Sequence, residues 1–206
     1  LIALVHLLWA IGTSWLAAYS VTLAVLFLVP VISLFSSLQH EVLHGHPTRW
    51  RVVNEAFVFL PFTLFVPYGR FRDMHLEHHR DEHLTDPYDD PETNYLDPSV
   101  WGRLPRPVRA LLRVNNTLAG RILIGPALST LALLRDDARL MAAGDRPVLN
   151  SWLLHIAGLA VLAVWLGWIG TMPIWAYVLA AYLAYGVLKI RTFLEHRAHD
   201  RARGRS

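Results

Sequence analysis

Eleven histidines are the residues of this 206-residue sequence best suited to chemistry, and most of them fall in three short groups. The first group lies in QHEVLHGHP, where His40 and His44 are four residues apart. The second lies in MHLEHHRDEH, where His75 precedes His78 by three residues and His79 by four. On a helix these spacings place two side chains on one face, with their Cβ atoms roughly 5 to 6 Å apart. Each group therefore predicts a pair of imidazoles that can share a metal ion.

The third group, RTFLEHRAH, adds His196. The chain has no cysteine, which excludes disulfides, iron–sulfur clusters and thiolate-ligated haem, so any metal must be bound by nitrogen or oxygen. One zinc ion takes three or four protein ligands, whereas two iron ions with open positions can use six imidazoles or more. The sequence thus predicts two iron ions, with metal ligands His40, His44, His75, His78, His79 and His196.

The other histidines are expected to play different parts. His6 and His155 each stand alone in an apolar segment and are predicted to be structural, hydrogen-bonded groups. His46 is two residues from His44 and off its helical face, while His83 and His199 lie four and three residues from better candidates, so we place all three around the metals or on the surface.

The elements that carry these groups are predicted to cross a membrane. No Asp, Glu, Lys or Arg occurs from Leu1 to Gln39, and one helix of that length would overshoot a hydrocarbon core of roughly 30 Å. This run must therefore fold back as two spans, and a second pair surrounds Gly170-Thr171-Met172-Pro173. We expect a single all-α integral membrane domain over residues 1–206, with a helical cap and four spans at about 1–17, 21–46, 149–168 and 173–196.

Two hairpins leave the whole middle segment and all three histidine groups on one side of the membrane. Basic residues flank the spans on that side, whereas the two short connections opposite carry none, so the positive-inside rule predicts that the metal side is cytoplasmic. The formal net charge of +3 is read as an orientation signal rather than as a nucleic-acid surface. The flanking residues are Arg49, Arg51, Arg135, Arg139, Arg146, Lys189, Arg191 and Arg197.

Two parts of the middle segment carry their own predictions. The apolar run 56–68 contains Pro61 and Pro67 and is too short to cross, so it is expected to be re-entrant or interfacial. The run 104–118 places its arginines on one helical face and suits a helix on the membrane surface, although an ordinary solvated helix face explains that pattern equally well.

The motifs together resemble the membrane fatty acid desaturase and hydroxylase superfamily. The likeness rests on HEVLHGHPTR, HLEHHRDEHLTDPYDDPE and KIRTFLEHRAH, and it extends from Ser37 to His199. It implies a di-iron enzyme that uses dioxygen and electrons from a ferredoxin-type or cytochrome-type protein to introduce a double bond into a lipid acyl chain. Bacterial members share these stretches, which implies a bacterial inner membrane. A hydroxylase or a carotenoid-modifying oxygenase of the same superfamily is the alternative.

The sequence departs from the family pattern at its end. The family carries a further H-x-x-H-H motif after the last spans, and nothing here matches it. The chain also begins with Leu at the start of an apolar run. We therefore expect a fragment truncated at both ends, which supplies only part of the ligand set and is inactive alone.

Two alternatives come from other classes. His40-Glu41-Val42-Leu43-His44 also fits the H-E-x-x-H signature of zinc metalloproteases, in which the glutamate is the general base. That reading leaves His75, His78, His79 and His196 without a role. A metal transporter or scaffold is disfavoured, because the histidine groups lie at span ends and no acidic residue lies in the interior of a span, away from those ends.

Overall fold

The computed structural model describes residues 1–80 and 96–195, and every regular element in these ranges is a helix. α1 (Ile2–Ile11) continues through a π-helical turn (Gly12–Leu16) into α2 (Ala17–Tyr19). α10 (Arg146–Val164) likewise ends in a π-helical turn, Trp165–Ile169. The remaining helices are α3 (Val21–Leu43), α4 (Arg51–Phe57), α5 (Tyr68–Arg80), α6 (Pro98–Arg103), α7 (Arg106–Asn115), α8 (Leu118–Leu123), α9 (Gly125–Ala142) and α11 (Ile174–Glu195).

Four helical segments are long and apolar enough to cross a membrane: Ile2–Tyr19, Val21–Leu43, Arg146–Ile169 and Ile174–Arg191. The prediction of an all-helical membrane protein with four spans is therefore confirmed. Large apolar side chains on these helices point outward, such as Leu26 and Leu154, each 62% exposed. Such a surface is unfavourable in water and suits contact with lipid.

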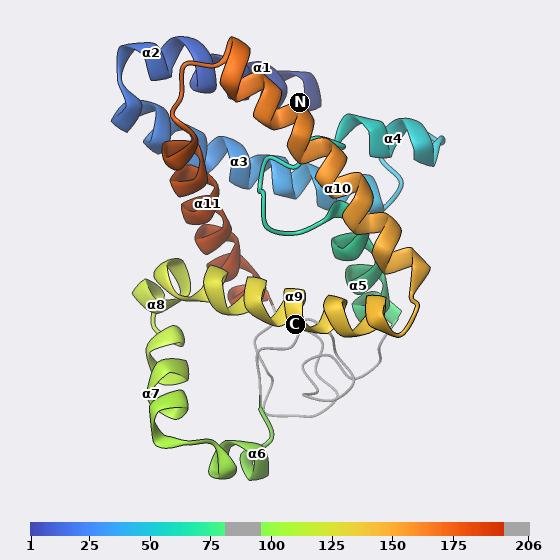
Figure 1. Cartoon of the computed structure of the whole chain (residues 1–206), viewed down its shortest axis with the longest axis vertical. Helices are drawn as coiled ribbons and strands as arrows, with labels where there is room; N and C mark the ends of the chain where they lie inside the picture. Colours follow the sequence, from blue (N-terminus) through green and yellow to red (C-terminus); the bar gives the residue numbers. More distant parts are fainter. Residues whose placement is uncertain (81–95, 196–206) are drawn as a thin grey trace.

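The two hairpins turn at the same end of the molecule (Figure 1). Ser20 ends the first turn and begins α3, since its side chain accepts a hydrogen bond from the Leu23 N–H. The backbone N–H groups of Thr171 and Met172 in the second turn donate to the carbonyl of Thr13, at 3.0 and 3.1 Å. The two turns are in contact, so the other ends of the four spans lie on the opposite side of the bundle. The segment between the two hairpins joins the spans on that side, as predicted from two hairpins in sequence. α11 packs mainly against α3.

The apolar run after α4 enters the bundle between the spans. Residues 58–67 are not helical, yet Phe62 is fully buried and stacks on Trp9 with 4.4 Å between ring centroids. Tyr177, on α11, donates its hydroxyl to the Phe62 carbonyl at 3.0 Å and accepts from Trp9 Nε1 at 2.9 Å. Irregular backbone is tolerated at membrane depth only where protein satisfies its polar groups. The re-entrant form of the prediction for 56–68 agrees with this packing.

His155 likewise provides a hydrogen-bond partner for a backbone carbonyl of this run, that of Leu64. Its Nε2 lies 2.9 Å from the carbonyl oxygen of Leu64, and only 5% of the side chain is exposed. Leu64 has a φ of 64°, a left-handed conformation that costs a residue with a Cβ roughly 1 to 2 kcal/mol. His155 thus stabilises a strained turn within the bundle, in line with its predicted structural role. His6 bonds to its own helix, with Nδ1 3.0 Å from the Ile2 carbonyl.

Replacing His155 with leucine is expected to lower the free energy of unfolding by about 1 to 3 kcal/mol, because the Leu64 carbonyl then loses its partner in a dry environment. His6→Leu is the matched control and should cost less, since the Ile2 carbonyl already belongs to a helix. Thermal unfolding of both variants in detergent measures the difference. Equal losses in the two variants would contradict a special role for His155.

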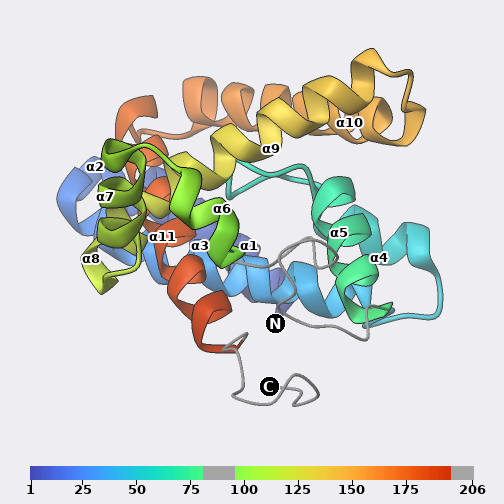
Figure 2. The ribbon, with the colours of Figure 1, turned by 90° about the horizontal axis from the view of Figure 1, so that it is seen from below.

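The helices between the two hairpins cover the other end of the spans. α5 is in contact with both α3 and α10, and α4 lies beside it against α3 (Figure 2). α8 packs against α11, while α6 and α7 extend beyond it, far from α1 and α2 (Figure 1). This arrangement places α5, which carries the second histidine group, next to the end of α3, which carries the first.

Candidate metal centre

The first histidine pair lies at the end of α3. His40 is in the last turn and His44 is the residue after the helix, with 4.7 Å between their ring centroids. Gly45 follows with a φ of 93°, which a glycine adopts without strain. The N–H of Gly45 bonds to the Val42 carbonyl and that of the next residue to the Glu41 carbonyl, at 3.0 and 3.2 Å. This Schellman ending fixes where His44 stops the helix.

The second pair lies on α5, one turn apart. The Nε2 atoms of His75 and His79 are 2.9 Å apart, and His75 is 6% exposed. Across the two helices, the ring centroids of His75 and His40 are 4.6 Å apart, and those of His79 and His44 are 4.9 Å apart. One nitrogen from each of these four imidazoles lies within 4.8 Å of the others. We call His40, His44, His75 and His79 the histidine cluster.

The cluster offers a donor set that fits a first-row transition metal. All four ligand atoms are imidazole nitrogens, which suit iron, zinc and copper. His44 and His79 are exposed, so small molecules can reach these two imidazoles from solvent. The structure thus brings together four of the six histidines that were predicted as ligands.

The electrostatics of the cluster favour neutral imidazole at His44. Partial burial lowers the pKa of His44, and the nearby imidazoles of His40 and His75 lower it further, while Glu41 opposes them. A metal ligand must be neutral imidazole, because a protonated ring nitrogen has no free lone pair. The surroundings of His44 therefore favour the neutral form of the imidazole, which is the form that binds a metal.

His78 lies next to the cluster without belonging to it. Its side chain is 3% exposed, and its ring centroid is 5.9 Å from that of His75 and 5.8 Å from that of His79. The assignment of His78 as a ligand stays a prediction. His196, His83 and His199 lie outside the described residues.

The end of α11 approaches the first histidine pair. Arg191 donates from Nη1 to Ser37 Oγ at 2.7 Å, and Ser37 is three residues before His40 on α3. His196 follows Arg191 by five residues. This contact places the end of α11 beside α3, and the role of His196 as a ligand stays a prediction.

A buried ion pair holds α5 in place, and sequence reasoning missed it. Asp137 on α9 is fully buried and accepts from Arg70 on α5, with Nε at 2.9 Å and Nη2 at 2.8 Å from Oδ1. Trp152 on α10 donates from Nε1 to Oδ2 of the same carboxylate at 2.8 Å. The Asp137 carboxylate thus joins three helices, α5, α9 and α10. Its partner Arg70 precedes His75 by five residues on α5. No signal in the sequence separates Asp137 from its exposed neighbour Asp136.

A second tie joins α5 to α4. Arg72 donates to Glu55 at 2.6 Å and to Asp73 at 2.8 Å, and Arg51 bonds to the same Glu55 carboxylate at 2.9 Å. Burial raises the pKa of Glu55, but hydrogen bonds from Arg51 and Arg72 outweigh it and hold the pKa below its usual value. The first turns of α5 are therefore fixed from two sides.

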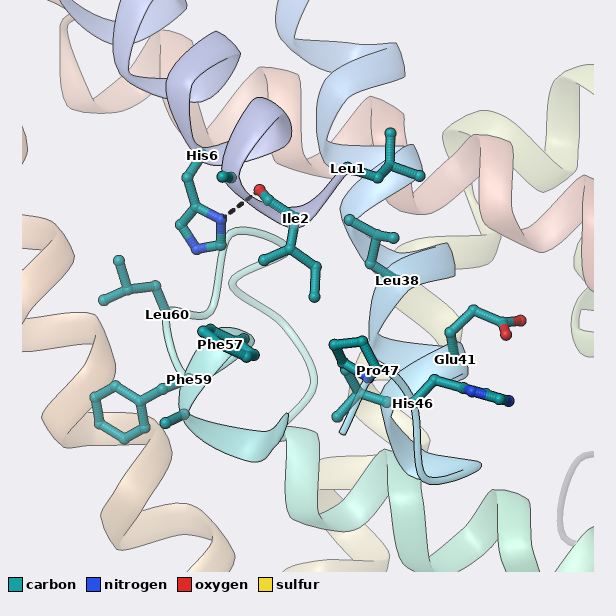
Figure 3. Close-up of a pocket in the computed structure, with 13 residues that line it drawn as sticks. Leu1, Ile2, His6, Leu38, Glu41, His46, Pro47, Phe57, Phe59 and Leu60 are labelled. Carbon is teal, nitrogen blue, oxygen red and sulfur yellow. Dashed lines mark hydrogen bonds between the residues drawn. The ribbon is translucent and has the colours of Figure 1, made fainter. Parts of the chain in front are cut away.

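An apolar cavity of about 770 Å³ lies beside the end of α3, lined by α3 residues other than those of the histidine cluster (Figure 3). Glu41 and His46 stand at its edge with Pro47, and Ile2 and Leu60 are among its apolar lining residues. No member of the histidine cluster lines it. His46 is exposed and lines this cavity.

Comparison with known proteins gives one result. The family model described as fatty acid desaturase matches residues 13–205, nearly the whole chain. No curated protein and no solved structure shows a significant match.

Proposed function

This chain belongs to the fatty acid desaturase family, and on that basis we propose that it introduces a double bond into a lipid acyl chain, using dioxygen and two iron ions held by its histidines. The observation that carries the proposal is the convergence of four imidazoles from α3 and α5 at the end of the spans. Family membership supports an oxygen-dependent oxidoreductase, and the cluster supports a metal centre at its heart.

In this proposal, the histidine cluster holds the metals together with His78 and His196. When bound and reduced by an external electron-transfer protein of ferredoxin or cytochrome type, the iron supplies the power to take hydrogen from an unactivated C–H bond. In the balanced reaction dioxygen accepts four electrons, two from the acyl chain and two from the donor, and takes up the two hydrogens of the acyl chain and two protons from water, so that it leaves as two water molecules. The acyl chain loses two hydrogens and gains one double bond.

The part played by the protein is to position ligands and substrate. Two of the cluster imidazoles end a span and the other two lie on a helix clamped by buried and half-buried ion pairs, so the ligand set is held before metal binds. An acyl lipid can reach such a centre laterally from the bilayer. We place the centre on the cytoplasmic side of a bacterial inner membrane, because the arginines flank the spans on this side.

The zinc protease reading of His40-Glu41-x-x-His44 finds little support. Glu41 is 60% exposed and stands at the edge of the apolar cavity (Figure 3), where its Oε1 lies 3.5 Å from Nδ1 of His40. Four converging histidines also exceed the two that this signature provides.

Because residues 1–206 are expected to lack part of the ligand set, the reaction is tested with the full-length protein. It is expressed in bacterial membranes with a ferredoxin and its reductase, and the lipid acyl chains are analysed by gas chromatography and mass spectrometry. A new double bond, absent without dioxygen, is the expected product. Hydroxylated acyl chains or oxidised carotenoids would assign the alternative chemistries of the superfamily. No oxidised lipid of any kind, from protein that carries its iron, would overturn the proposal.

A further inference from the structure

The segment from α6 to α8 has an unusual charge pattern. Residues 98–123 contain five arginines and no Asp or Glu. One of the five, Arg121, is buried and bonds to Asn116. The other four, Arg103, Arg106, Arg109 and Arg113, are exposed or half-exposed. We call residues 98–123 the basic segment.

α7 in the basic segment is amphipathic and has no buried residue. Its arginines at 106, 109 and 113 share one helical face, while Val108, Leu111 and Leu112 share the other. Val108 is 38% and Leu111 is 40% exposed, so the described part of the chain leaves this apolar face partly uncovered. α6 adds Trp101, whose ring lies 5.7 Å from the Arg113 guanidinium.

The basic segment is attached to a span at a defined depth. A Cβ on Gly186 of α11 would lie 2.6 to 3.1 Å from the backbone of Ile122. The backbones of α8 and α11 are therefore in close contact at this glycine. The Tyr182 hydroxyl donates to the Leu123 carbonyl at 2.7 Å. Lys189, the first charged residue of α11, comes three residues after Gly186 and seven after Tyr182, or about 5 to 10 Å along a helix. α8 therefore meets α11 where the span passes from the apolar to the charged zone.

We infer that the basic segment lies on the bilayer, with the apolar face of α7 in the acyl boundary and its arginines on anionic phospholipid headgroups. This inference does not depend on the proposed reaction. Amphipathic helices with a basic polar face bind anionic membranes in this orientation. Trp101 is of the residue type that favours the interface.

Other occupants explain fewer of these features. A second copy of the chain would set one basic segment against another, which repels. A soluble acidic protein would pair with the arginines but leave Val108 and Leu111 in water. Only a bilayer satisfies the apolar face and the arginines together, at the depth where α8 meets α11.

The absence of cysteine makes a direct test available. Leu111→Cys carries a nitroxide label on the apolar face, and Arg109→Cys is the matched control on the opposite face of the same helix. Each variant of the otherwise intact protein is placed in lipid nanodiscs, and collisions of the label with oxygen and with a soluble nickel complex are measured. Oxygen should dominate at position 111 and the nickel complex at position 109. Nickel access at 111, or access of neither reagent there, would overturn the inference in favour of solvent or a protein partner.

The lipid charge is tested with the same Leu111→Cys label. Nanodiscs with phosphatidylglycerol should hold the label deeper than nanodiscs of phosphatidylcholine alone. Replacing Arg106, Arg109 and Arg113 with glutamine in that variant should remove the difference. Equal depth in both lipids before that replacement would contradict headgroup binding.

Discussion

His79→Ala and His44→Ala are each expected to lose most of the bound iron and to lose desaturation activity by more than roughly 100-fold. Loss of a group that merely supports a metal ligand already costs about 10- to 100-fold, and these residues are proposed as ligands themselves. Both side chains are exposed, so their removal should cost little folding stability. Iron per chain and product per iron are the two quantities to measure.

His46→Ala is the matched control for this prediction. His46 is exposed, two residues from His44 and outside the histidine cluster, so iron and activity should stay near those of the unmodified protein. Unchanged iron in His44→Ala, or equal losses in His44→Ala and His46→Ala, would mean that the histidine cluster is not the metal centre.

The second large effect is expected at Asp137. Asp137→Asn leaves Arg70, only 13% exposed, without its counter-ion, and breaking a buried ion pair by removing one partner typically costs about 3 to 5 kcal/mol. Asp136→Asn is the matched control, because Asp136 is 64% exposed and lies 3.6 Å from Arg139 in a surface pair worth about 0 to 1 kcal/mol. Chemical unfolding in detergent compares the two variants.

Asp137→Asn should also reduce iron content, because the Arg70 pair fixes the helix that carries His75 and His79. A double variant, Arg70→Met with Asp137→Leu, should recover stability relative to Asp137→Asn, since no charge is left buried without a partner. Similar stabilities of Asp137→Asn and Asp136→Asn would contradict this role for the carboxylate.

Most of the membrane architecture follows from local properties of the sequence. The uncharged run from Leu1 to Gln39 forces two spans, and the structure places them at Ile2–Tyr19 and Val21–Leu43. The pairing of His40 with His44 follows from helical periodicity alone. The prolines of 56–68 exclude a regular span, and in the structure residues 58–67 of this run form a non-helical segment packed between the spans.

The contacts that join distant segments were not predictable. Asp136 and Asp137 are adjacent and chemically identical, and only the tertiary contacts of α9, the ion pair with Arg70 on α5 and the hydrogen bond from Trp152 on α10, distinguish the buried one. The same holds for the meeting of the two histidine pairs, because the sequence gives each pair but not the angle between α3 and α5. Likewise His78 and His79 are neighbours, yet only His79 joins the cluster in the described part of the chain.

The most direct test of the proposed centre is the metal content of the protein purified from its own membrane, measured by inductively coupled plasma mass spectrometry beside a Mössbauer spectrum of iron-57-enriched protein. For the full-length protein we predict close to two irons per chain, little zinc, and a Mössbauer signal of iron bound by nitrogen and oxygen. One zinc per chain, without iron and without loss in a His75→Ala variant, would contradict the di-iron proposal and return attention to His40-Glu41-x-x-His44.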